Sequence, residues 1–179
     1  RFAIPTPQAD VSIKDGVFGG MISFIKVDPQ SGHMQLAFQL HVPGYNYDLS
    51  RAGRGVSHGW SFFSTYYTEQ ARTLREANAS QRDKDYVAAV NWKRAEQCVA
   101  EGKAEEWKTP YAHNRVGEDG VARTETIRTQ KVLNAKNCPD MMYYLPTPKS
   151  PHGADLDPTG EYIVGGGKLA TVIPVHSFS

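Results

Sequence analysis

The segment TPKSPHGADLDPTGEYIVGGGKLATVIPV at 147–175 constrains the fold more than any other part of the chain. Apolar and polar residues alternate on both sides of the four-residue turn DPTG at 157–160, as in the two strands of a hairpin. Proline suits the second position of such a turn, and glycine suits a later position with positive φ. Before the hairpin, Pro151 and Gly153 flank His152, which predicts a buried imidazole fixed at the start of a strand.

Short β-branched and aromatic runs precede this hairpin. The runs at 20–27 and 34–42 predict a second hairpin around DPQSGH, and further strands are expected within 56–67, at 85–92 and at 141–146. The polar stretch 43–55 is interpreted as a connection, 70–83 as a charged surface insertion, and 104–140 as a loop or irregular ribbon. Strands of this length and spacing predict an all-β fold, either a sandwich or a propeller.

One helix is expected on the outside of this β architecture. Asn91 is a good N-cap for the run WKRAEQCVAEGK, and Gly102 is placed to end the helix. Ala95, Cys98 and Val99 recur on one side of it and predict its buried face.

Composition excludes some functions without identifying one. The 179 residues carry a formal net charge of +1, with basic and acidic residues interspersed, so we expect no nucleic-acid partner. No run approaches the roughly 20 apolar residues of a membrane span, so none is expected in these residues. Cys98 and Cys138 lack metal-ligand spacing, and we expect structural thiols instead of metal ligands or disulfide partners.

Several motifs are spread over nearly the whole chain. They are TYYTE at 65–69, TLREA at 73–77, KDYVAAVNWKRAEQCVAEGK at 84–103, YLPTPKSPHG at 144–153, then SPHGADLDPTGEYIV and GGKLATV. Together, and in this order, they resemble the nitrous oxide reductase family, in detail its atypical branch. The resemblance favours the propeller over the sandwich.

The resemblance implies a particular domain organisation. Residues 1–179 are expected to be a partial N-terminal domain, about two to three blades of a seven-bladed β-propeller with a helical insertion. Both ends are interpreted as cuts in a longer chain, and the C-terminal cupredoxin domain with its dinuclear copper centre is expected to be absent from these residues. The parent is expected to be a periplasmic homodimer that takes electrons from a donor such as a c-type cytochrome or a cupredoxin. The fragment alone is expected to be inactive.

The same resemblance implies the chemistry. The family reduces nitrous oxide to dinitrogen and water at a tetranuclear copper–sulfide cluster, in the last step of denitrification, and histidines from several blades bind that cluster. The histidine of the SPHG step is one of them, so His152 is the expected catalytic and cofactor-binding residue. Nitrogen donors commonly complete sulfide-bridged copper.

A calcium site is also carried over from the family. The expected ligands are one side chain or carbonyl from each of Tyr66, Glu69, Ala77, Asp85 and Ser150. Calcium prefers hard oxygen donors, which carboxylates and backbone carbonyls supply. The family often has asparagine at the position of Ser150; the shorter hydroxyl leaves direct ligation, ligation through water and no ligation open.

Two interpretations without nitrous oxide chemistry stay open. Hairpins of the DPTGEYIVGG type occur in many propeller repeats, so the chain could be a non-catalytic extracytoplasmic binding module that does not require His152. A calcium-stabilised structural domain that binds no copper is the third interpretation. No nucleotide-binding or hydrolase motif is present.

Overall fold

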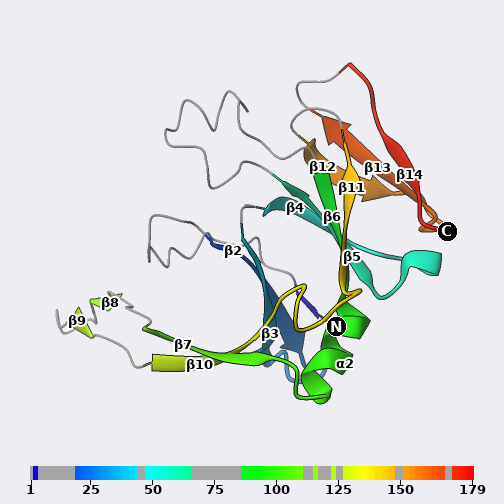
Figure 1. Cartoon of the computed structure of the whole chain (residues 1–179). Helices are drawn as coiled ribbons and strands as arrows, with labels where there is room; N and C mark the ends of the chain where they lie inside the picture. Colours follow the sequence, from blue (N-terminus) through cyan, green and yellow to red (C-terminus); the bar gives the residue numbers. More distant parts are fainter. Residues whose placement is uncertain are drawn as a thin grey trace.

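The computed structural model consists mainly of β-strands arranged in stacked sheets (Figure 1). It describes residues 2–3, 19–43, 47–65, 86–110, 115–116, 122–123, 127–147, 151–167 and 171–179. The predicted calcium ligands and the insertion at 70–83 lie outside the described residues.

The first sheet has the strand order β1-β2-β3-β10-β7. Its strands are β1 (Phe2–Ala3), β2 (Gly19–Val27), β3 (Met34–Pro43), β7 (Glu105–Pro110) and β10 (Ile127–Leu133). The predicted hairpin of β2 and β3 is confirmed. Strand β10 pairs antiparallel with β7 and parallel with β3. The expectation of a loop or irregular ribbon at 104–140 is therefore wrong for 105–110 and 127–133, which form regular strands. The short strands β8 (Arg115–Val116) and β9 (Ala122–Arg123) pair with each other.

The central sheet is antiparallel throughout, in the order β11-β6-β5-β4. It contains β4 (Tyr47–Ala52), β5 (Trp60–Thr65), β6 (Tyr86–Asn91) and β11 (Met142–Pro146), with the 3₁₀ helix η1 (Gly55–Ser57) between β4 and β5. The hairpin sheet contains β12 (Pro151–Leu156), β13 (Tyr162–Gly167) and β14 (Val175–Ser177) in sequence order. The stretch 43–55 was expected to be a connection, but its residues 47–52 form strand β4.

The inner strands of the central sheet, β5 and β6, are buried on both faces. On one face, Phe63, Ala88 and Val90 join the large core of the first sheet. On the other face, Phe62 and Val87 pack with residues of the hairpin sheet. Successive strand residues point to opposite faces, and both faces are covered here, so β6 is apolar at every position from 87 to 90. The stacked sheets form an all-β fold of partial propeller blades, as predicted.

The helix α2 (Trp92–Ala100) follows β6 directly, as the sequence predicts. The side chain of Asn91 accepts a hydrogen bond from the backbone N–H of Arg94 at 3.0 Å, which satisfies one free donor of the first turn. Ala95 and Cys98 are fully buried. Gly102 has a φ of 74°, the conformation that ends helices.

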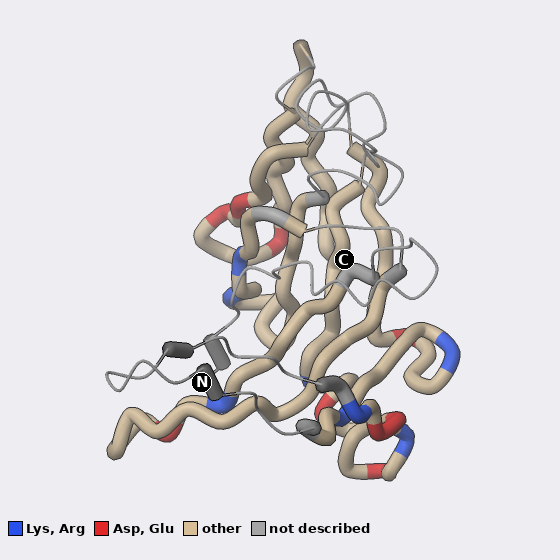
Figure 2. The backbone as a smooth tube through the Cα atoms, turned by 90° about the vertical axis from the view of Figure 1, so that its left-hand side faces the viewer, with Lys and Arg blue, Asp and Glu red and all other residues tan. Residues whose placement is uncertain are grey.

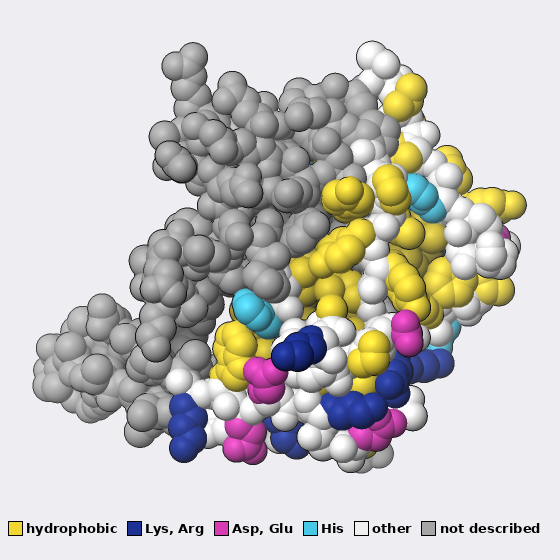
Figure 3. All heavy atoms as spheres, viewed as in Figure 1, with side chains coloured by type: hydrophobic (Ala, Val, Ile, Leu, Met, Phe, Trp, Pro, Cys, Tyr) yellow, Lys and Arg dark blue, Asp and Glu magenta, His cyan; other side chains and the backbone are white. Residues whose placement is uncertain are grey.

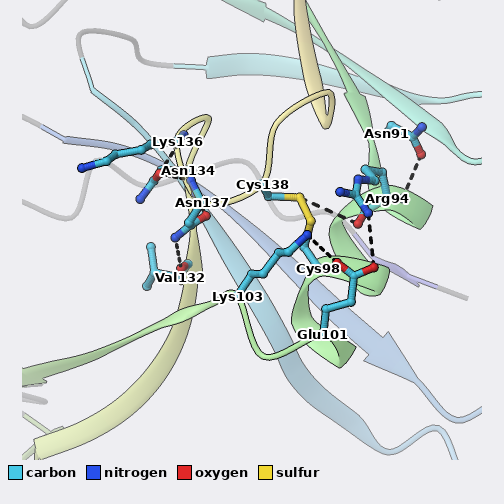
Figure 4. The surroundings of a disulfide bond; sticks show 10 residues. All are labelled: Asn91, Arg94, Cys98, Glu101, Lys103, Val132, Asn134, Lys136, Asn137 and Cys138. Carbon is cyan, nitrogen blue, oxygen red and sulfur yellow. Dashed lines mark hydrogen bonds and ion pairs between the residues drawn. A yellow bond between two sulfur atoms is a disulfide. The ribbon is translucent and has the colours of Figure 1, made fainter.

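The expectation of two structural thiols is wrong, because Cys98 and Cys138 form a disulfide. Figure 4 shows it joining α2 to the loop between β10 and β11. In that loop the amide oxygen of Asn134 accepts hydrogen bonds from the backbone N–H groups of Lys136 and Asn137, at 2.9 Å each. The two cysteines are 40 residues apart in sequence, a separation that carries no local signal of pairing.

Apolar side chains also lie on the surface. In Figure 3 they gather over the side of the molecule that carries the central and hairpin sheets. Tyr162, Ile173 and Val175 of the hairpin sheet region are 50%, 71% and 58% exposed. Charged residues of both signs lie close to one another on strands, on the helix and in turns (Figure 2). Within the described residues, no helix is both long and apolar enough to cross a membrane.

Candidate metal site

The hairpin of β12 and β13 that carries His152 is closed by the predicted turn. The N–H of Gly160 donates to the carbonyl of Asp157 at 3.0 Å, and Pro158 occupies the second turn position. Gly160 has a φ of 77°, which glycine adopts without strain. The turn chemistry expected from the sequence is therefore confirmed.

The carboxylate of Asp157 holds the turn together. One oxygen accepts hydrogen bonds from the hydroxyl of Thr159 at 2.6 Å and from its backbone N–H at 3.0 Å. The other accepts from the backbone N–H of Tyr162 at 2.9 Å. These bonds, that of the Thr159 hydroxyl first, lower the pKa of Asp157 to about 2, because they favour the ionised form.

Replacing Asp157 with asparagine is expected to lower the melting temperature of the protein in a pH-dependent way. A depressed pKa in the folded state contributes stability above the unfolded value near 3.8, and that stability is lost as the pH falls toward 2. The difference in melting temperature between the unmutated protein and the Asp157→Asn variant should therefore be largest at pH 7 and should shrink between about pH 4 and pH 2. Thermal unfolding at a series of pH values measures it, with Glu106→Gln in β7 as the control. A difference that is constant over this range would contradict the prediction.

The turn at 157–160 packs closely against residues 54–56, which connect β4 and β5 of the central sheet. The N–H of Val56 donates to the carbonyl of Thr159 at 3.2 Å. A Cβ atom on Gly160 would lie 1.8 Å from the carbonyl oxygen of Arg54, and one on Gly55 would lie 1.9 Å from that of Thr159. Moving the two turns apart would break the hydrogen bond between Val56 and Thr159. Position 55 and position 160 therefore both require glycine. The interlocked turns fix β12 against β4 and β5.

His152 lies at the other end of β12, where the strand begins, as predicted. The expectation of a buried ring is wrong, because Pro151 is buried and His152 is exposed. The ladder between β12 and β13 shifts register between Pro151 and Ala154, and Gly153 has a φ of 118°. His152 is therefore presented on a β-bulge, a feature that redirects side chains next to functional sites.

The arrangement fits one corner of a metal site. An exposed imidazole on a braced strand can donate one nitrogen to copper. Within the described ranges, no group of three or more His, Cys, Asp or Glu residues is placed to hold a metal ion. The histidine rings of His41 and His58 pack edge-on against Trp107 and Trp92. The further ligands of a metal cluster would therefore come from outside the described residues.

The five predicted calcium ligands are Tyr66, Glu69, Ala77, Asp85 and Ser150, and all lie outside the described residues. Two features of the site region were not predicted from the sequence: the interlocked turns and the bulge. The spacing Pro-His-Gly carried a signal for the bulge, because a glycine inside a strand often marks one.

Comparison with known proteins gives a similarity over nearly the whole chain. No family model matches the chain. A nitrous-oxide reductase from Pseudomonas fluorescens is 25% identical over 173 residues, which are 97% of this chain. The matched region is 24% of that relative's length, so the chain spans about a quarter of the protein it resembles. The chain is thus similar, end to end, to one part of a nitrous-oxide reductase.

Proposed function

We propose that this chain is part of a nitrous oxide reductase, which converts nitrous oxide, two electrons and two protons to dinitrogen and water. The observation that carries the proposal is the similarity to a nitrous-oxide reductase over 97% of the chain. Two features of the structure support it. The packed sheets form an all-β fold of partial propeller blades, and the histidine of the SPHG motif is exposed on a bulge.

In this proposal His152 binds one copper ion of a tetranuclear copper–sulfide cluster through an imidazole nitrogen. The bound cluster supplies the redox chemistry. The chain's own contribution is to hold the imidazole in a fixed place. Strand β12 is anchored at its far end by the interlocked turns and along its length by Ala154 and Leu156, which pack against the central sheet. A ligand held on a rigid element preserves metal geometry.

The remaining parts of the proposed enzyme follow from the family resemblance. They are the other blades of a seven-bladed propeller, a cupredoxin domain with a dinuclear copper centre, a second subunit, and an electron donor such as a c-type cytochrome or a cupredoxin. The proposed location is the periplasm. The disulfide between Cys98 and Cys138 supports it, since disulfides persist in oxidising compartments and are rare in the cytosol.

Metal analysis of the full-length protein tests the proposal against its rivals. Copper with acid-labile sulfide, in a fixed ratio to protein, is the expected result. A folded protein that binds neither, even after reconstitution with copper, would leave the non-catalytic extracytoplasmic propeller as the better interpretation. Calcium without copper would favour the structural domain.

Removing calcium is expected to lower the melting temperature of the full-length protein. We propose that Glu69 and Asp85 are carboxylate ligands of this ion and that Tyr66 and Ala77 supply backbone carbonyl oxygens, with Ser150 binding directly, through water or not at all. An ion that binds the folded state alone stabilises it by about 2.7 kcal/mol at one hundred times its dissociation constant. Thermal unfolding with EGTA, and again after calcium is restored, measures the effect.

The variant Asp85→Asn separates a specific site from a general salt effect. It should melt at the lower temperature with or without calcium, and magnesium should not replace calcium in the unmutated protein. An unmutated protein whose melting temperature ignores the chelator would count against the site.

A further inference from the structure

The bulge beside His152 contains one residue more than the facing strand. Pro151 pairs with Gly167 and Ala154 pairs with Gly165, so that His152 and Gly153 together face Gly166. This two-against-one arrangement is the defining feature of a β-bulge.

The extra residue reconciles two burial requirements. Residues three apart on a regular strand point to opposite faces. Pro151 and Ala154 are nevertheless both buried, and Ala154 packs in the core shared with the central sheet. The inserted residue brings the side chains of Pro151 and Ala154 to the same face of the sheet. As a result His152 alone of this part of the strand is left exposed.

Glycine is needed at position 153 because of its backbone conformation and not for lack of space. Gly153 has a φ of 118°, where residues with a side chain are strained. A Cβ atom there would meet the Cδ1 atom of Leu49 at 3.4 Å, an ordinary contact. Alanine would therefore fit the space but favour a different backbone, and the change would reorient the preceding residue, His152.

We propose that Gly153 is a positioning residue, whose bulge aims the His152 imidazole at the copper site. The inference rests on the proposed function and adds to it a residue that does not itself touch metal. It predicts that Gly153→Ala disturbs the cluster while leaving the sheets folded.

Two other glycines provide matched controls. Gly102 also has positive φ, at 74°, with nothing within 4 Å of an added Cβ, and it lies at the end of α2, on another part of the fold. Gly102→Ala therefore reports the general cost of backbone strain. Gly166 faces the bulge, and a Cβ there would lie 3.8 Å from the carbonyl oxygen of His152, so Gly166→Ala adds a methyl group without forcing the bulge to change.

The experiment measures copper and sulfide per protomer, the visible absorption spectrum of the cluster and the melting temperature, all on the full-length protein. Gly153→Ala should retain copper at least about tenfold more weakly under competition with a chelator, the range seen when groups that orient metal ligands are lost. Its spectrum should change, whereas Gly102→Ala and Gly166→Ala should keep the unmutated spectrum. Gly153→Asn should weaken copper retention as Gly153→Ala does, because asparagine tolerates the left-handed region near a φ of about +57° and not a φ of 118°.

The outcomes separate the two proposals. Normal copper retention and an unchanged spectrum in Gly153→Ala would overturn the positioning role, even if His152→Ala loses the cluster. Unfolding of both Gly153 variants while Gly102→Ala stays folded would also overturn it, because the glycine would then be a general structural requirement. An unmutated protein without copper, or a His152→Ala protein with a full cluster, would instead overturn the proposed function of the site.

Discussion

Replacing Cys98 and Cys138 together with alanine is expected to lower the free energy of unfolding by about 4 kcal/mol, the value for opening a loop of roughly 40 residues. Both cysteines are fully buried. The bond ties α2, which follows β6, to the loop that leads into β11, the neighbour of β6 in the central sheet. Without the disulfide the unfolded chain gains entropy, and the helix loses its covalent attachment to that loop.

Hydrogen exchange of the α2 amides in the full-length protein measures this effect locally. In Cys98→Ala alone, the α2 amides should lose as much protection from hydrogen exchange as in the double variant, because either substitution breaks the disulfide. Treating the unmutated protein with a reductant under mild denaturation should give the same result. Equal protection of α2 in the oxidised and the alanine proteins would show that the disulfide contributes no stability.

Replacing His152 with alanine is expected to abolish nitrous oxide reduction by the full-length protein. The imidazole is the proposed ligand at one corner of the cluster, and its loss leaves that copper ion without its nitrogen donor. The fold should persist, since His152 is exposed and substitutions of exposed side chains usually change stability by less than about 0.5 kcal/mol. Activity with an artificial reductant, copper content and melting temperature are the three measurements.

His33→Ala is the matched control for this variant. His33 is also exposed, and it lies in the turn between β2 and β3, on the first sheet. It should keep full activity and full copper. If His152→Ala also kept activity near the unmutated level with normal copper, the assignment of His152 would be wrong.

Local patterns predicted those elements whose stability is encoded by neighbouring residues. The turn at 157–160 needs proline and glycine at fixed places, and the helix begins after Asn91 because its side chain caps the first turn. The apolar run from Val87 to Val90 predicted a strand, and these four residues are buried. In each of these cases, the physical cause acts over a few residues.

Other features depend on partners that are distant in sequence. Strand β4 contains polar residues and is defined by its pairing with β5. Strand β10 joins the first sheet by parallel pairing with β3, about ninety positions away, which no local pattern encodes. The pairing of Cys98 with Cys138 likewise follows from the fold that brings them together.

The candidate site was found by its motif, and the structure changes its description. Pro151 and Gly153 correctly indicated that His152 lies at the start of a strand, yet they also suggested burial of the ring. The bulge reverses that expectation, because it buries Pro151 and Ala154 and leaves the histidine exposed. The proposed calcium ligands remain predictions from the family resemblance.

The most direct test of the central claim is nitrous oxide reduction by the purified full-length protein, loaded with copper and sulfide and supplied with an artificial reductant. We expect one dinitrogen to form for each nitrous oxide consumed, with two electrons taken from the reductant. A protein with a full complement of copper and sulfide that forms no dinitrogen would contradict the proposed function.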